Sequence, residues 1–360
     1  MRQVASYNCH DIVRFQVAGG GGAGLKWGAD FRFSPFRADG VERPDICLNV
    51  GRFTPANDHC YLVDHRYYVK EDYFYCRDAE GAASWEVEIA GFEGGAITMN
   101  LDLGRRFTAR PGALVSTPVL LPLSFMLRAI EHRLGMDGYL LSHSAAVARE
   151  GRAYLLSGRS GCFKTSLCMD LVRRAGYGLL GDDRVILGGD RAWAFPLNRA
   201  LFDFMAQRLP DETHLGPLQK AQFVAHYLRG GHGEADGVGP AQVGAVLLLG
   251  RGQGPEVVFQ PLPADSLPGV VAGLLVSNRL EAFAGMGMPG FGISSAPFLR
   301  YMLAYSFVFP RSPVATMERG LAQGLEEALR GIPLYRVEVP PRYGPEVSHQ
   351  VQRFMEGICP

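Results

Sequence analysis

Short alternating runs of hydrophobic and polar residues fill the first third of the chain. The runs are rich in β-branched and aromatic residues, and Gly, Asp and Pro separate them, as in strands joined by turns. They occur at residues 12–17, 67–70, 73–76, 85–89 and 97–103. The pattern predicts a small, mainly antiparallel β domain over residues 1–117.

The period of the pattern then changes, and the predicted second domain covers residues 118–360. Residues 120–134 carry apolar side chains at helical spacing, and the apolar runs 139–143 and 145–148 form a strand pair. A glycine-rich polar stretch, 230–239, is a candidate mobile lid. We also expect a hairpin at 184–195, strands at 243–250 and 332–339, and helices at 264–275, 299–307, 317–330 and 344–355.

The most informative stretch lies between two predicted strands of the second domain. An apolar run at residues 154–157 leads into the loop 158–166, Gly-Arg-Ser-Gly-Cys-Phe-Lys-Thr-Ser, and a helical pattern follows. A second strand at 177–181 then ends in Asp182 and Asp183. The spacing is that of a βαβ nucleotide site. The loop itself nearly matches the phosphate-binding pattern G-x-x-x-x-G-K-[ST].

Each residue type in this loop has a chemical reason to be there. Backbone N–H groups of the loop and of the new helix converge on phosphate oxygens. Lys164 would reach the β- and γ-phosphates, and the Thr165 hydroxyl would hold Mg²⁺. The residues predicted to bind the nucleotide are Gly158, Arg159, Ser160, Gly161, Cys162, Phe163, Lys164, Thr165 and Ser166.

Phe163 departs from the pattern, because it stands where the last glycine is expected. Phenylalanine keeps the backbone N–H group but lacks the conformational freedom of glycine. We expect Phe163 to adopt ordinary helical φ and ψ angles with its ring directed away from the loop, which would leave the phosphate cradle intact. A ring folded over the loop would close the site instead.

Asp182 and Asp183 follow the second strand at the edge where the phosphates would lie. One carboxylate would hold Mg²⁺, and the other would accept the proton of an attacking hydroxyl. The sequence alone leaves open which of the two has which role. The arginines at positions 184, 199 and 311 are further candidates to offset negative charge in the transition state.

Composition narrows the class of protein. The chain has 360 residues, of which 47% are hydrophobic and 20% charged, so it folds into globular domains. Its formal net charge is zero, which predicts neither a nucleic-acid nor a membrane partner. The seven cysteines form no C-x-x-C pair, and the N-terminus lacks the apolar core of a signal peptide. We therefore expect a cytoplasmic protein.

The motif residues, taken together with His143 ahead of the loop strand, resemble the core of HPr kinase/phosphorylase and its serine-kinase relatives. More distantly, Leu-Gly-Asp-Asp at 180–183 resembles a loop of phosphoenolpyruvate carboxykinase. The resemblance covers roughly residues 138–187 and does not extend to the first domain. It implies an α/β P-loop kinase-like domain preceded by the smaller β-rich domain. It also implies that Asp183 is the base, that Asp182 contacts the metal, and that His143 contacts the transferred phosphoryl group.

Two functional hypotheses follow. The first is a kinase that uses Mg²⁺ and ATP, or another nucleoside triphosphate, to phosphorylate a hydroxyl of a peptide, a protein or a small molecule. Relatives in peptide natural-product pathways are the closest analogy, and the first domain would recognise the acceptor. The second is a non-catalytic sensor or scaffold with a degenerate loop, which Phe163 favours. A carboxykinase-like lyase would need a second metal site that the sequence does not contain. The sequence leaves open whether the protein is a homo-oligomer.

Overall fold

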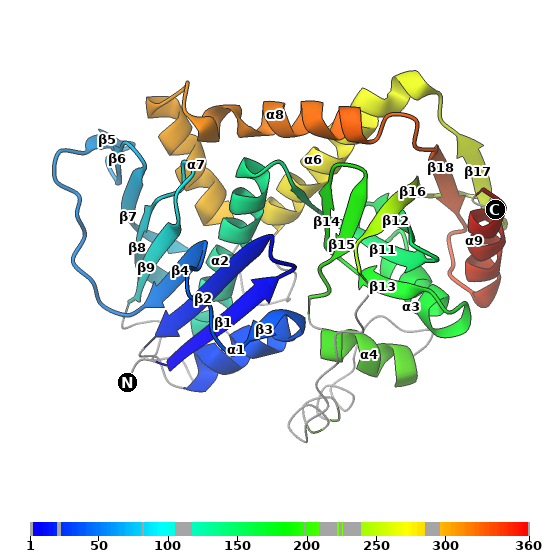
Figure 1. The fold of residues 1–360 in the computed structure, drawn as a ribbon, viewed down its shortest axis with the longest axis horizontal. Coiled ribbons are helices and arrows are strands. Elements are labelled where there is room, and N and C mark those ends of the chain that lie inside the picture. Colours follow the sequence, from blue (N-terminus) through cyan, green and yellow to red (C-terminus); the bar gives the residue numbers. More distant parts are fainter. Residues whose placement is uncertain are drawn as a thin grey trace. The chain divides into compact units, whose positions relative to one another are not determined.

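The computed structural model describes residues 3–19, 23–80, 83–104, 117–197, 199–208, 222, 225, 239–284 and 296–358. The chain forms two α/β units, each with its own sheet and helices (Figure 1). The first unit combines residues 1–139 with 279–321, and the second combines 140–278 with 322–360. The chain therefore leaves the first unit, returns to it and leaves it again.

A nine-stranded mixed sheet forms the first unit, in the order β3-β1-β2-β4-β9-β8-β7-β6-β5. The pairs β2–β4 and β4–β9 are parallel and the other pairs are antiparallel, in agreement with a mainly antiparallel β domain. The strands are β1 (Gln3–Cys9), β2 (Val13–Gly19), β3 (Arg37–Ala38), β4 (Ile46–Val50), β5 (Tyr61–Val63), β6 (Tyr67–Lys70), β7 (Tyr73–Glu80), β8 (Ala83–Ala90) and β9 (Ile97–Leu103).

Helices complete the core of this unit and move its boundary away from the predicted one. They are α1 (Ala23–Phe33), α2 (Thr117–Met136), α7 (Ala296–Val308) and the short 3-10 helix η1 (Ser34–Phe36). Helix α2 packs on β4 and β9, and the α7 residue Tyr301 stacks on Phe74 with ring centroids 4.6 Å apart. The predicted boundary between residues 117 and 118 is corrected to 139/140, because these apolar helix faces are buried on the first sheet.

The second unit is built on another mixed sheet, with the order β10-β14-β15-β16-β12-β11-β13 and with β18 and β17 beyond β16. Strand β12 runs parallel to β16, and β16 runs parallel to β18. The strands are β10 (Leu140–Ser142), β11 (Ser144–Arg149), β12 (Arg152–Gly158), β13 (Gly178–Gly181), β14 (Val185–Gly188), β15 (Arg191–Ala194), β16 (Ala241–Arg251), β17 (Val258–Pro261) and β18 (Leu334–Val339).

Helix α3 (Lys164–Arg174) packs on the sheet of the second unit over β11, β12 and β13, with α9 (Pro345–Ile358) beside it (Figure 1). Leu167 and Leu171 of α3 are 1% exposed, which confirms the predicted helical spacing. The remaining helices are α4 (Arg199–Arg208), α6 (Leu267–Ala284), α8 (Pro313–Ala328) and the 3-10 helix η3 (Ala264–Ser266). Helices α6 and α8 each contain a boundary between the two units.

Most predicted elements of the second half are present with ends shifted by a few residues, including the hairpin β14–β15, the strands β16 and β18 and the helices α7 to α9. Helix α6 is also present, but it ends at Ala284, well beyond the predicted end at residue 275. The hydrophobic pattern does not predict α1. The glycine-rich stretch 230–239, predicted as a lid, lies outside the described residues except for Gly239.

Candidate functional site

The strand directions of the second sheet bring four segments to one edge. Strands β12 and β13 each pair antiparallel with β11, so their carboxyl ends lie at the same edge, next to the amino end of β11. The carboxyl end of β16 joins them, because Gly158 of β12 is paired with Leu249 of β16. The glycine loop (residues 158–163), His143, the Asp pair and Arg251 therefore share this edge.

Phe163 adopts a left-handed backbone conformation, with φ 61° and ψ 21°, at the cap position of α3. The expectation of ordinary helical angles was wrong. The glycine pattern calls for a positive φ at this position, and the chain keeps that geometry although a bulky side chain disfavours it by about 1–2 kcal/mol. The backbone at Phe163 therefore has a conformation that glycine adopts readily.

The ring of Phe163 is held by contacts outside the loop. It packs against the hydrophobic core of the second unit and lies 5.5 Å from the ring of Tyr343. The guanidinium of Arg251 lies over the same ring, 4.7 Å from its centroid, while Nε of Arg251 donates to the carbonyl of Gly161 at 2.8 Å. Tyr343 also donates to Asp170 of α3 at 2.7 Å. No pattern in the sequence points to Arg251 or Tyr343, which come from distant segments.

Lys164 folds back across the glycine loop from the first turn of α3. Its ammonium donates to the carbonyl of Gly158, and a second contact to the carbonyl of Arg159 measures 3.4 Å. The side chain is 8% exposed. The first helical hydrogen bond of α3 joins Leu167 N–H to Phe163 O, so the amides of the first turn point out of the helix toward the loop. The amino end of α3, which carries a partial positive charge, thus faces the glycine loop.

The other predicted loop residues line the same turn. The amide of Cys162 donates to the carbonyl of Arg159 at 3.3 Å, and the Cys162 side chain is buried in the core. Thr165 is half-buried and Ser166 is buried, whereas Ser160 is exposed.

A tight turn after β13 carries the two carboxylates. The carbonyl of Arg184 lies so close to Gly181 that a Cβ atom there would sit 1.9 Å from it. The glycine is therefore required for space, and the close approach reverses the chain directly after Asp182 and Asp183. The turn then enters β14, whose partner β10 leads to His143.

Opposite electrostatic effects act on the two neighbouring carboxyl groups. Burial and, second, the charge of Asp183 raise the pKa of Asp182 to about 7. Burial also acts to raise the pKa of Asp183, but the charge of Arg184, the hydrogen bond from His143 and the charge of Lys164 outweigh it and hold that pKa well below its usual range. The pair therefore offers one carboxylate that is ionised at neutral pH and one that titrates there.

His143 connects the Asp pair to helix α6. Its Nε2 atom lies 3.0 Å from Oδ1 of Asp183, and its Nδ1 atom lies 3.1 Å from the hydroxyl of Ser277. Asn278 accepts a hydrogen bond from the His143 amide and donates one to the carbonyl of Leu141, both at 2.6 Å. The predicted residues His143, Lys164 and Asp183 are thus brought together, and Ser277 and Asn278 are additions that only the fold reveals.

Of the three candidate arginines, two lie near the Asp pair. The Arg184 guanidinium is 3.9 Å from a carboxylate oxygen of Asp183, and its side chain is 5% exposed. Arg199 pairs with Asp203 at 2.8 Å, and its charge acts on the carboxyl of Asp182. Arg311 belongs to the first unit.

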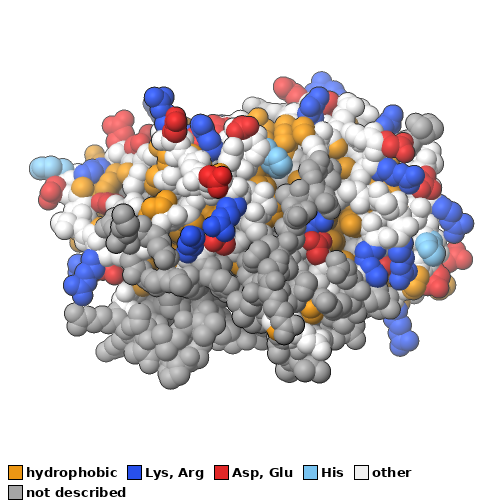
Figure 2. Space-filling model, turned by 60° about the horizontal axis from the view of Figure 1, so that its bottom comes forward, with side chains coloured by type: hydrophobic (Ala, Val, Ile, Leu, Met, Phe, Trp, Pro, Cys, Tyr) orange, Lys and Arg blue, Asp and Glu red, His pale blue; other side chains and the backbone are white. Residues whose placement is uncertain are grey.

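The described residues hold no group of three or more His, Cys, Asp or Glu side chains arranged to bind a metal. Within the same residues, no helix has the length and apolar character needed to cross a membrane. On the face shown in Figure 2, acidic and basic side chains of described residues are interspersed.

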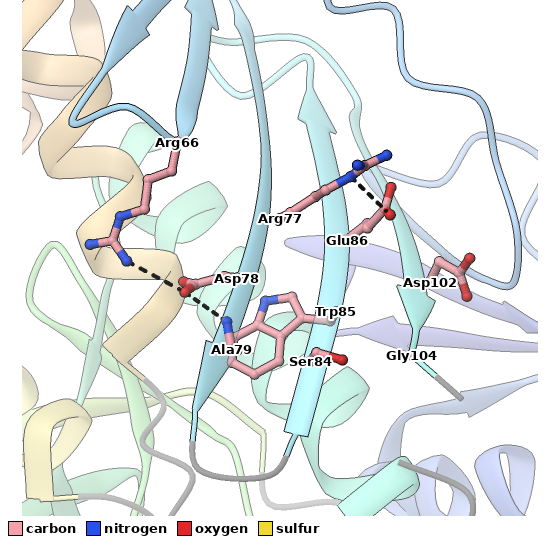
Figure 3. A pocket seen from close by; sticks show the side chains of 9 residues that line it. All are labelled: Arg66, Arg77, Asp78, Ala79, Ser84, Trp85, Glu86, Asp102 and Gly104. Carbon is pink, nitrogen blue, oxygen red and sulfur yellow. Dashed lines mark hydrogen bonds and ion pairs between the residues drawn. The ribbon is translucent and has the colours of Figure 1, made fainter. Parts of the chain in front are cut away.

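The first unit contains a separate pocket of about 540 Å³ at the ends of β7, β8 and β9 (Figure 3). Asp78 faces Arg66 on one side of β7, whereas Arg77 and Glu86 pair on the other side, with Nε and Oε1 3.0 Å apart. Asp102 lies directly across from Glu86 in the strand register. The pocket therefore has charged walls of both signs.

Searches with models of protein families and with curated protein sequences gave no match to this chain.

Proposed function

We propose that the protein is a Mg²⁺-dependent kinase of the HPr kinase/phosphorylase type, which transfers the γ-phosphoryl group of ATP, or of another nucleoside triphosphate, to a hydroxyl. One observation carries this proposal. A loop with a left-handed turn, the amino end of α3 and Lys164 lie at the same sheet edge as an ionised Asp183 that His143 contacts at 3.0 Å. These are the parts that phosphoryl transfer needs: a phosphate cradle, a cation and a proton acceptor.

The residues present fit a nucleotide with Mg²⁺. A pKa of about 7 at Asp182 indicates a carboxyl group that lacks compensating positive charge, which a divalent cation would supply. Mg²⁺ is commonly held by one or two protein ligands together with substrate phosphates, so a site without a dedicated cage of carboxylates is consistent with it. Asp182 and the Thr165 hydroxyl would hold the ion. When bound, Mg²⁺ neutralises charge that develops on the phosphate oxygens.

The remaining roles follow from charge and position. Lys164 would exchange its contacts with the Gly158 and Arg159 carbonyls for phosphate oxygens. Asp183 would accept the proton of the acceptor hydroxyl, and the low pKa keeps this carboxylate ionised at neutral pH. His143 would hold Asp183 and contact the transferred group. Arg251 would keep the glycine loop in shape through the Gly161 carbonyl.

The acceptor is a peptide, a protein or a small molecule with a hydroxyl group. We assign its recognition to the first unit, where the pocket of Figure 3 offers both guanidinium and carboxylate groups. Mixed charge of this kind favours a polar acceptor such as a peptide.

The experiment measures Mg-ATP binding by calorimetry and transfer of labelled γ-phosphate to water and to a peptide library. Lys164→Ala should abolish both binding and transfer, and Asp183→Asn should abolish transfer while binding remains. Lys26→Ala and Asp265→Asn, which alter half-buried and exposed residues outside the site, are the matched controls. Unchanged transfer in Asp183→Asn would contradict the proposal.

The rival function is nucleotide sensing without catalysis. Its supporting observation is the bulky Phe163 in the loop. It predicts that Mg-ATP binds to the wild-type protein and that no labelled phosphate reaches water or any peptide under the same conditions.

A further inference from the structure

One side chain of α6 holds the backbone on both sides of Ser142. Asn278 is 4% exposed, and its amide group donates to the carbonyl of Leu141 and accepts from the amide of His143, both at 2.6 Å. Strand β10 ends at Ser142 and β11 begins at Ser144, so His143 lies between the two strands. Asn278 thus fixes the position of the His143 backbone at the edge of the sheet.

The neighbouring residue, Ser277, contacts the ring that this backbone carries. Its hydroxyl lies 3.1 Å from Nδ1 of His143, while Nε2 on the other side of the ring lies 3.0 Å from Oδ1 of Asp183. The side chain of His143 is 7% exposed. Both ring nitrogens therefore have a defined polar neighbour, one from α6 and one from the turn after β13.

The chemistry of the two neighbours selects one hydrogen-bond arrangement. An ionised carboxylate is an acceptor only, so the ring can bond to Asp183 only with a hydrogen on Nε2. In a neutral imidazole the other nitrogen is then an acceptor, and a serine hydroxyl is able to donate to it. In the opposite tautomer the Nε2 lone pair would face the carboxylate and repel it.

We propose that Ser277 and Asn278 are positioning residues, which hold the ring and the backbone of His143 so that its Nε2–H donates to Asp183 and fixes the orientation of that carboxylate. The hydrogen bond occupies Oδ1 of Asp183, so Oδ2, which lies 3.9 Å from the Arg184 guanidinium, is the oxygen that would accept the proton of an acceptor hydroxyl. The consequence for catalysis rests on the proposed kinase function, whereas the tautomer of His143 does not.

The first test measures the tautomer directly. Long-range ¹H–¹⁵N NMR spectra of the histidine rings distinguish a protonated from an unprotonated ring nitrogen, and His143→Gln assigns the signals among the nine histidines. The full-length protein without nucleotide should show hydrogen on Nε2 of His143. Ser277→Ala should leave the hydrogen on Nε2 but move the ¹⁵N resonance of the unprotonated Nδ1, which loses the hydrogen bond from the hydroxyl. Ser277→Thr, which keeps the hydroxyl, should restore the wild-type spectrum.

Two spectra would overturn the proposal: a wild-type ring with its hydrogen on Nδ1, or a Ser277→Ala ring whose Nδ1 resonance is unchanged. Ser348→Ala is the matched control, because that helical serine donates to the carbonyl of Pro345 and belongs to α9. Circular dichroism and a melting curve check that each variant is folded. The control should leave the His143 signals unchanged.

The second test measures steady-state transfer of the γ-phosphoryl group. Loss of a residue that orients a reacting group costs about tenfold to 100-fold, so kcat of Ser277→Ala should fall by that factor. KM for Mg-ATP should stay within about twofold because no phosphate contact changes. An unchanged kcat in Ser277→Ala would overturn the positioning role while the kinase function stands. A wild-type protein without transfer activity would contradict the kinase function, and the NMR result would still decide the tautomer.

Discussion

The guanidinium of Arg251 lies over the ring of Phe163 while its Nε atom donates to the carbonyl of Gly161, so one side chain joins the carboxyl end of β16 to two residues of the glycine loop. Tyr343 contacts the same ring from the loop after β18. The bulky residue in the loop is thus held by two segments that are distant in sequence. These contacts offset the cost of a left-handed backbone at Phe163.

Because the backbone at Phe163 is left-handed, we expect alanine and glycine at this position to differ in stability. Phe163→Ala and Phe163→Gly both lose the ring contacts, but only alanine keeps the steric conflict at φ 61°. We expect the glycine variant to be the more stable by about 1 kcal/mol. Urea unfolding of both variants measures the difference.

The control is the pair Arg173→Ala and Arg173→Gly at an exposed position inside α3, where alanine should be the more stable by about 1 kcal/mol. The same order of stability at both positions would contradict the left-handed conformation of Phe163.

The raised pKa of Asp182 predicts a pH-dependent stability. The carboxyl group titrates near 3.8 in the unfolded chain and near 7 in the folded protein, so the folded state binds more protons between these values. This group's contribution to stability is therefore present below about pH 4 and is lost as the pH rises through 7. Asp182→Asn removes the titration and should exceed the wild type in stability by about 1–3 kcal/mol at pH 8, with a smaller gap at pH 5.

Thermal unfolding at pH 5 and pH 8 measures this gap, with Asp265→Asn as an exposed control. Asp183 does not interfere, because its depressed pKa acts on stability only below about pH 4. A gap that is equal at both pH values would show that Asp182 has an ordinary pKa.

The turn that carries the Asp pair requires a residue without a Cβ atom at position 181, which is Gly181. A Cβ atom there would lie 1.9 Å from the Arg184 carbonyl and 3.5 Å from that of Phe195, so backbone has to move. We expect Gly181→Ala to lower the free energy of unfolding by about 3 kcal/mol. Gly250→Ala is the strand control, since nothing lies within 4 Å of a Cβ there. Chemical denaturation compares the two, and equal stabilities would contradict the close approach.

Asn278 should be important for stability as well as for position. Asn278→Ala leaves the carbonyl of Leu141 and the amide of His143 without this partner in a buried place. An unsatisfied buried polar group costs about 1–3 kcal/mol, and two groups are affected. Amide hydrogen exchange should become faster at residues 141–143 in this variant. Unchanged exchange there would mean that the side chain of Asn278 does not bond to the backbone of Leu141 and His143.

The local parts of the site were readable in the sequence. The helical spacing of Leu167 and Leu171, the strand before Gly158 and the strand before Asp182 all have the predicted form, because these elements depend on residues that are neighbours in the chain. The backbone of Phe163 was not readable. Its left-handed angles depend on packing against Tyr343 and Arg251, which the local pattern does not contain.

The sequence by itself therefore determined a β-rich first part, an α/β second part and the strand–loop–helix–strand segment with Lys164 and the Asp pair. Only the tertiary structure decided that residues 279–321 return to the first unit. It also decided that Ser277 and Asn278 contact His143 and that Arg251 contacts the glycine loop. The physical reason is that periodicity records which face of an element is buried but not which distant element covers it. Strand order and the directions of β12, β13 and β16 make that choice.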